Sequence, residues 1–371
     1  RLGAVDESIN LAHDIVNNFY LPDLLAIGKI YAEKGMVDGG GLSKKRVLSY
    51  GGYPDEPYTG ISNGDFFKKS LVRSNGVVEN FAAGVDKAKF IPLEGPDFMD
   101  PQIMAEEVEH SWFEYPNGEA ALNPIDGVTE PKYTGPKSGS KDNWEYLDEA
   151  AKYSWIKSPV FRGGTTEVGP LAKYIVVYTK VKQGIITNPT WVEKMMVNQI
   201  ETVSKVLGLP AHVWMTTMVG RTACRALDAQ VAAALSRYFY NKLIANIKAG
   251  DTTVANSEKF DPNTWPKEAK GVGILDAPRG GLGHWIHIKD GRSENYQCIV
   301  PSTWNACPRT TKGEHGAYED AMIDTHVKVP EKPLEIVKVI HSFDPCLACA
   351  THLYNKEGKQ IVSVNTDALC K

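Results

Sequence analysis

The chain is 371 residues long; 42% of its residues are hydrophobic, 23% are charged, and its formal net charge is −4 at pH 7. These values are typical of a globular protein with a large core, folded as one big domain or two ordinary ones. The acidic balance and the lack of a basic run interleaved with aromatic residues argue against nucleic acid as the main partner. The longest apolar stretches, at 174–178 and 231–235, are far shorter than a membrane span.

The first 157 residues divide into a helical part and a loop-rich part. Residues 4–34 carry apolar side chains at helical spacing, and Pro22 interrupts them, so we expect two helices. Residues 42–145 have weak periodicity and many glycines and prolines, which predicts short strands and long loops packed on a helical core. We expect the aromatic-rich runs at 110–115 and 152–157 to hold loops in place.

Residues 190–250 are strongly helical. Asn188-Pro189-Thr190 predicts the start of a first helix, which Gly208 ends. A second helix, rich in alanine, is predicted from about Val213 to Lys248, and its apolar spacing suits the central helix of a bundle. We interpret its arginines as snorkelling or ion-paired side chains rather than catalytic groups; they are Arg221, Arg225 and Arg237.

Beyond Trp265 the pattern becomes strand-like. Residues 285–288 lead to Asp290-Gly291, a dipeptide typical of a hairpin turn, and residues 296–300 form the expected return strand. A last helix is predicted to start near Pro333. The fold class is therefore expected to be α+β: a bundle of long helices, a small antiparallel sheet near residues 270–305, and long loops.

Three possible metal ligands recur every three residues near the end of the chain: Cys346, Cys349 and His352. Pro345 suits the first position of a helical turn. On that turn, residues three apart would differ in direction around the helix axis by about 60°, so all three side chains would lie on one side. A helix N-terminus favours the thiolate form that a metal requires. From the residues alone, the pattern is either a metal site or a pair of structural cysteines.

Other candidate residues carry weaker signals. The string DAPRGG at 276–281 sets Arg279 on a proline-fixed backbone beside two glycines that permit close approach, although a surface loop is the commoner explanation. Asp344, directly before the cysteine turn, could accept a hydrogen bond next to a metal site, but taken alone the residue is better explained as a helix N-cap. His284 and His287 read as structural, and the chain contains no Walker A or G-x-S-x-G motif.

With these residues in view, the chain resembles the C-terminal two-thirds of the large subunit of nickel–iron hydrogenases, of the membrane-associated uptake type. Residues 344–352, DPCLACATH, match the family signature D-P-C-x-x-C-x-x-H. The remaining matches cover nearly the whole chain in the right order; they lie at 126–131, 152–157, 167–171, 220–223, 277–280, 283–285, 296–305 and 316–319.

The resemblance implies a nickel–iron centre held by four cysteine thiolates, with cyanide and carbon monoxide on the iron. Cys346 is expected to be the terminal nickel ligand and Cys349 a bridging ligand. Arg279 is expected over the open side of the metals, with Asp344 pairing with it or orienting it. The residues expected around the cofactor are Pro278, Leu282, Val300, Pro301 and Ser302, with the Ser302 hydroxyl donating to a cyanide nitrogen.

The resemblance also implies partners. His352 is expected to bind a divalent cation, usually magnesium, together with the backbone carbonyl of Cys298. The activity is expected to be reversible oxidation of H2, with electrons passed to an iron–sulfur small subunit, because the few cysteines of this chain cannot hold a series of clusters. Membrane attachment is expected through that partner, at a periplasmic or membrane-associated location.

The sequence departs from the family pattern at both ends. The chain begins with Arg1, and the family's N-terminal R-x-C-G-x-C pair is absent, so we expect residues 1–352 to form one domain, incomplete at its N-terminus and inactive alone. Residues 353–371 resemble the extension that a maturation peptidase removes after His352, which would mark a precursor. Within it, residues 356–364 are expected to form a small hairpin, and Cys370 is expected to be incidental.

A second hypothesis comes from another class. A non-catalytic relative, or a zinc-binding assembly protein, could hold a structural zinc ion with Cys346, Cys349 and His352. The presence of Arg279 and of the segment VPSTWN at 300–305 argues against this reading.

Overall fold

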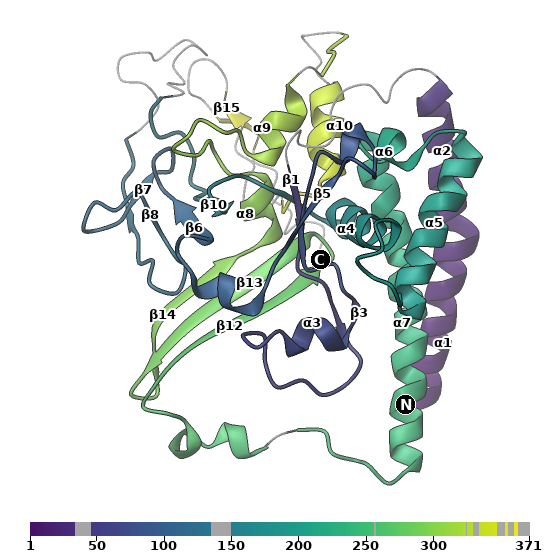
Figure 1. Ribbon diagram of the computed structural model, residues 1–371, viewed down its shortest axis with the longest axis horizontal. Helices are drawn as coiled ribbons and strands as arrows, with labels where there is room; N and C mark the ends of the chain where they lie inside the picture. The colour runs from purple at the N-terminus through teal and green to yellow at the C-terminus, as the bar shows by residue number, and fades with distance from the viewer. Residues whose placement is uncertain are drawn as a thin grey trace.

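The structure is a computed structural model that describes residues 1–33, 46–134, 150–255, 257–323, 325–328, 334–346, 353–354 and 360–362. Figure 1 shows long helices gathered on one side and small sheets on the other, with the sheet β12–β14 extending as a long ribbon. The fold is α+β, as the sequence predicted. Within the described residues, no helix is both long and apolar enough to span a bilayer.

The longer helices of the described chain form one layer. They are α1 (Leu2–Asp14), the π-helical turn η1 (Ile15–Tyr20), α2 (Leu21–Glu33), α4 (Pro170–Lys182), α5 (Trp191–Leu207), α7 (Met218–Lys248) and α10 (Leu334–Ser342). The short ones are α3 (Asp65–Lys69), η2 (Phe81–Ala83), η3 (Gly95–Met99), α6 (Ala211–Trp214), η5 (Ser257–Phe260), η6 (Pro262–Thr264), α8 (Pro301–Asn305) and α9 (Ala317–Met322).

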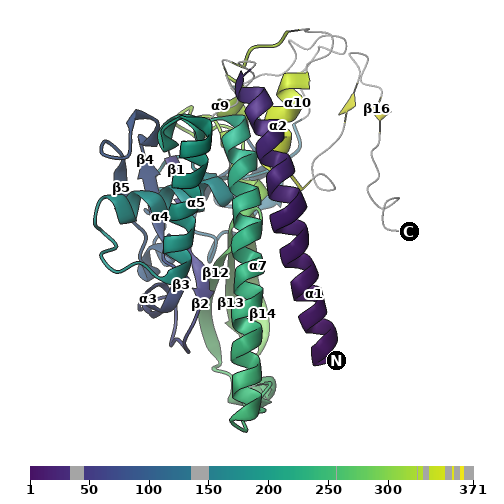
Figure 2. The same cartoon turned by 90° about the vertical axis from the view of Figure 1, so that its right-hand side faces the viewer.

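Helix α7 is the centre of the helical layer. It is 31 residues long, and α1, η1, α2, α4, α5 and α10 all contact it. Figure 2 shows α7 running beside the column formed by α1 and α2. The irregular turn η1 ends two residues before Pro22, and it contains Asn18, whose carbonyl the proline ring would crowd in a regular helix.

The predicted start of the second helix near Val213 is wrong. Residues 211–214 form the separate helix α6, and α7 begins at Met218 after Thr217, whose hydroxyl accepts a hydrogen bond from the Gly220 N–H. The break brings the chain back on itself, since a Cβ on Gly220 would lie 2.2 Å from the Trp214 carbonyl oxygen. The other helix boundaries agree with the predictions: α5 lies between Thr190 and Gly208, and the last described helix starts at Leu334.

Six small sheets account for the described strands. The order β11-β1-β4-β5 joins Glu167–Val168, Arg46–Ser49, Gly76–Glu79 and Lys89–Pro92, with only the β1–β11 pair parallel. The order β10-β6-β8 joins Ser158–Phe161, Met104–Glu107 and Ala121–Leu122. Two-stranded pairs are β2 (Gly52–Pro54) with β3 (Ser70–Val72), β7 (Phe113–Glu114) with β9 (Glu130–Pro131), and β15 (Leu353–Tyr354) with β16 (Gln360–Val362).

The predicted hairpin is confirmed and is longer than expected. Strands β12 (Glu268–Ala277), β13 (Gly280–Lys289) and β14 (Arg292–Ile299) form an antiparallel sheet. Asp290 and Gly291 turn between β13 and β14 with φ of 49° and 71°, the left-handed values that this tight turn requires. The β15–β16 pair agrees with the hairpin expected in the C-terminal extension.

The core has two main clusters, and strand β1 separates them. Val47 packs with residues of α4, α5 and α7, whereas Leu48 packs with Trp285 of β13 and its neighbours. Successive side chains of a strand face opposite ways, so one short strand contributes to both clusters. The loop-rich region therefore packs on the helical core, as predicted.

The two aromatic-rich runs lie next to each other. The Trp112 N–H donates to the Ser154 carbonyl at 2.7 Å, and the Tyr153 N–H donates to the His110 carbonyl at 2.9 Å. The expected role in holding loops is confirmed, because these backbone hydrogen bonds join the two runs to each other.

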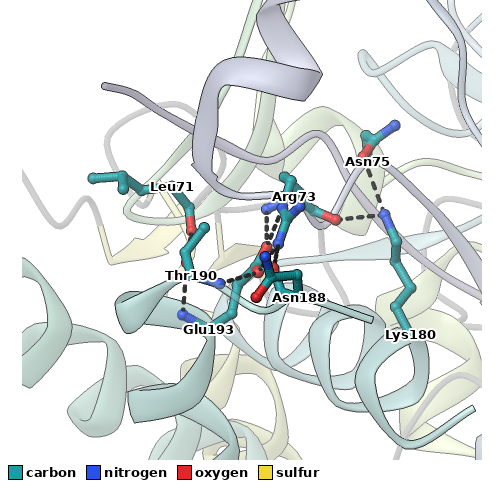
Figure 3. Close-up of polar contacts among 7 residues, drawn as sticks. All are labelled: Leu71, Arg73, Asn75, Lys180, Asn188, Thr190 and Glu193. Atoms are coloured by element: carbon teal, nitrogen blue, oxygen red, sulfur yellow. Dashed lines mark hydrogen bonds and ion pairs between the residues drawn. The ribbon is translucent and has the colours of Figure 1, made fainter. Parts of the chain in front are cut away.

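The start of α5 is tied to strand β3 by a buried carboxylate. Glu193 is fully buried, and it accepts hydrogen bonds from the Arg73 N–H at 2.9 Å and Nε at 3.0 Å and from the Thr190 N–H at 2.9 Å (Figure 3). The Thr190 hydroxyl accepts in turn from the Glu193 N–H and donates to the Leu71 carbonyl. This capping box fixes the first turn of α5 against the loop after β3.

Glu193→Ala is expected to lower the free energy of unfolding by about 3 kcal/mol or more, because Arg73 and the helix end would lose a buried acceptor. The matched control is Glu201→Ala on the same helix, whose exposed pair with Lys182 should be worth less than about 1 kcal/mol. Urea denaturation measures both, and equal losses would contradict the prediction.

The buried ammonium of Lys180 should make the stability of the protein depend on pH. Its ammonium donates to the Arg73 carbonyl at 2.5 Å and to Asn75 at 3.2 Å (Figure 3), and burial lowers its pKa from 10.5 to about 8. Between these pH values the unfolded chain binds one more proton than the folded chain. Relative to Lys180→Met, the free energy of unfolding of the wild type should therefore rise with pH across this window, by up to about 3 kcal/mol, in urea denaturation of both proteins at pH 8 and pH 10.5.

Candidate functional site

Arg279 lies on a tight turn between two strands. Ala277 of β12 pairs with Gly280 of β13, so Pro278 and Arg279 alone form the turn. The string DAPRGG is thus a two-residue hairpin tip rather than a long surface loop. Both tip residues are exposed to solvent, and the Arg279 side chain is 46% exposed.

The base of this turn is held by Asp276. Its carboxylate accepts hydrogen bonds from the Ser49 hydroxyl at 2.5 Å, the Tyr50 N–H at 3.0 Å and the Gly51 N–H at 2.9 Å. Burial raises the pKa of the Asp276 carboxyl, against the opposing effects of the Lys173 ammonium and these donors. This role of Asp276 was not predicted from the sequence, although an acidic residue beside a short turn is a signal for contacts with backbone N–H groups.

Gly280 fixes the turn from the other side. Its φ is 125°, and a Cβ there would lie 2.5 Å from the Gly169 nitrogen. Gly169 is the N-cap of α4, directly after β11. The turn therefore packs against the start of α4 with no room for a side chain.

The segment that leads to Cys346 meets Arg279. The Arg279 Nε donates to the Asp344 carbonyl at 2.9 Å and lies 3.3 Å from the Asp344 carboxylate. Asp344 has a φ of 55°, and none of residues 344–346 is helical. Its carboxylate faces Arg279, and the N-cap role that the residue alone suggested concerns a turn whose residues from 347 onward lie outside the described part of the chain.

The same segment contacts helix α8. The Cys346 N–H donates to the Ser302 hydroxyl oxygen at 3.3 Å. Val300 is the exposed N-cap of α8, Pro301 is its buried first residue, and Leu282 is half-buried in β13. The structure thus brings Arg279, Asp344, Ser302 and Cys346 together, whereas Cys349 and His352 lie outside the described residues.

Cys298 is on β14 and pairs across the sheet with His284. Its sulfur lies 3.2 Å from the His284 Nδ1, and hydrogen bonding to Cys298 raises the pKa of Tyr296. His287 contacts Glu268 at 2.9 Å, in agreement with a structural role.

Among the described cysteines, Cys346 and Cys298 are half-buried, whereas Cys224 and Cys307 are buried. Cys224 and Cys307 are buried thiols whose pKa burial raises, which favours the neutral form that binds metals poorly. Cys346 is half-buried, and its backbone N–H is held by Ser302. Within the described ranges no three His, Cys, Asp or Glu side chains form a metal-ligand cluster.

Two arginines of α7 complete the surroundings of Asp344. Arg221 pairs with buried Glu167 at 2.7 Å and donates to the Ser342 hydroxyl at 2.8 Å. Arg225 lies 3.7 Å from the Asp344 carboxylate. Ion pairing was predicted for these arginines and is confirmed, but their position beside Asp344 was missed, because helix periodicity does not say which distant segment a side chain meets.

Comparisons with known proteins agree on one family. A sequence model described as nickel-dependent hydrogenase matches residues 1–352. The uptake hydrogenase large subunit of Rhodobacter capsulatus is 45% identical, and the Hydrogenase-1 large chain of Escherichia coli K12 is 44% identical, each over 98% of this chain. The chain spans 57% of the length of each relative. The solved Ni-Fe-Se hydrogenase from D. vulgaris Hildenborough has a TM-score of 0.69 at 28% identity, covering 95% of this chain and 61% of that one.

The close packing at Gly280 gives a prediction. Gly280→Ala should lower the free energy of unfolding by at least about 3 kcal/mol, because the backbone is left-handed and the new methyl group would overlap Gly169. Gly273→Ala in β12 is the matched control, since a Cβ there meets nothing within 4 Å. Thermal and urea unfolding report both changes, and a neutral Gly280→Ala would show that the turn can move.

Proposed function

The chain belongs to the nickel-dependent hydrogenase family, and from this premise we propose that it is catalytic large-subunit sequence of a nickel–iron hydrogenase that reversibly oxidises H2. The observation that carries the proposal is that Arg279 contacts Asp344 and Ser302 contacts Cys346, since both Asp344 and Cys346 belong to the motif at 344–352. A cysteine thiolate is the soft ligand that nickel and low-spin iron favour.

The described residues fit such a centre. We assign two of its thiolates to Cys346 and Cys349, and the other two to the part of the relatives' length that this chain does not span. A bound nickel–iron group, with cyanide and carbon monoxide on the iron, would supply the redox-active metals at which H2 reacts. The Ser302 oxygen accepts from the Cys346 N–H, and we assign the Ser302 hydroxyl as a donor to a cyanide nitrogen.

Arg279 and Asp344 form the proposed charged wall of the site. The ion pair holds the guanidinium in one orientation, and Pro278 fixes the backbone beside it. Leu282, Val300 and Pro301 are assigned to the apolar surroundings of the diatomic ligands, where they would exclude water.

His352 and the Cys298 carbonyl are proposed ligands of a magnesium ion. The Cys298 carbonyl accepts from the Gln297 amide at 3.4 Å, and carbonyl oxygens are among the ligands that hard divalent cations take.

The proposed partner is an iron–sulfur small subunit that takes the electrons and attaches the complex to the membrane on the periplasmic side. Residues 1–352 are proposed to act as one domain. Residues 353–371, whose strands β15 and β16 pair with each other, are proposed to be removed by a peptidase after His352.

Metal analysis of the purified, assembled complex tests the function. We expect nickel and iron in the wild type, and at least about a hundredfold loss of H2-dependent dye reduction with loss of nickel in Cys346→Ser. Cys224→Ala, which removes a buried thiol of α7, should keep its nickel. Zinc without nickel or iron in the wild-type complex would favour the structural-zinc alternative instead.

A further inference from the structure

Arg225 connects two segments that are far apart in the sequence. One of its terminal nitrogens donates to the Pro278 carbonyl at 3.3 Å, and the other donates to the Ser342 carbonyl at 3.0 Å. The first carbonyl belongs to the turn that carries Arg279. The second lies at the end of α10, two residues before Asp344.

Both acceptors need a donor from outside their own element. A carbonyl in the last turn of a helix has no partner within the helix, and the Pro278 carbonyl is at the tip of a turn. A planar guanidinium can donate to two acceptors at once in a fixed geometry, which the single ammonium of lysine cannot do as well. The contacts of Arg225 are thus specific to arginine.

Arg225 is itself held in place by its helix. Arg221, one turn earlier on α7, makes the buried ion pair with Glu167 and lies 3.8 Å from the centre of the Phe343 ring. These contacts fix α7 against the segment 342–344, so the backbone that carries the Arg225 side chain is held in place.

We propose that Arg225 is a positioning residue that sets the separation between the Arg279 turn and the Asp344–Cys346 segment. Its guanidinium, 3.7 Å from the Asp344 carboxylate that Arg279 also contacts, fixes how these two groups face the metal ligand. This role deepens the proposed function, on which it rests, and it is distinct from the charged wall formed by Arg279.

Hydrogen exchange in the full, metal-free chain tests the positioning directly. In Arg225→Gln, the amide of Cys346 and those of residues 280–282 should exchange about tenfold faster, while the rest of α7 keeps its protection. Arg225→Lys should fall between the wild type and Arg225→Gln. The matched control is Arg237→Gln, further along α7, where the arginine pairs with Asp6 and should leave exchange at Cys346 unchanged.

Nickel content of the assembled complex is the second readout. Arg225→Gln should retain at most about a third of the wild-type nickel per folded chain, with Arg225→Lys partly restoring it and Arg237→Gln equal to the wild type. Unchanged exchange at Cys346 in Arg225→Gln would overturn the inference. A wild-type complex without nickel would overturn the proposed function, while the exchange result would still decide the role of Arg225.

Discussion

A buried ion pair between Arg221 of α7 and Glu167 of β11 supports both halves of the candidate site. Loss of either partner would leave the other charge buried without compensation, at a cost of about 3–5 kcal/mol. Glu167 lies in β11, the strand that leads to Gly169, and Gly280 packs against Gly169. Arg221 donates to the Ser342 hydroxyl and lies over the Phe343 ring. The arginine turn and the cysteine segment therefore depend on the same interaction.

Hydrogen bonds to neighbouring elements hold both segments of the candidate site in place. Asp276 holds the base of the Arg279 turn through two backbone N–H groups, and Ser302 at the start of α8 holds the Cys346 N–H. Groups fixed in this way lose little entropy when a cofactor binds and keep their geometry during a reaction. The charged side chains around Asp344 come from α7 and the β12–β13 turn, so the helical layer and the sheet both contribute.

Most of the fold could be predicted where a local signal was strong. Thr190, Glu193 and Gly208 mark the ends of α5, and Asp290-Gly291 marks the hairpin, because caps and turns are stabilised by neighbouring residues. The separation of α6 from α7 was missed, since helical periodicity continues across it and the deciding contact is the close approach of Gly220 to Trp214. The side-by-side packing of residues 110–115 and 152–157 was also missed, because it depends on backbone hydrogen bonds between segments that are far apart in the chain.

The sequence by itself determined the family and the candidate ligand motif. The D-P-C-x-x-C-x-x-H pattern and the other matching segments, which occur in the family's order, depend only on which residue stands at each position. Only the tertiary structure decided that Arg225 and Arg279 share Asp344 and that Asp276 holds the turn. These contacts join segments far apart in the chain. Their geometry follows from how α7, β11 and the β12–β13 turn pack together, which no local pattern encodes.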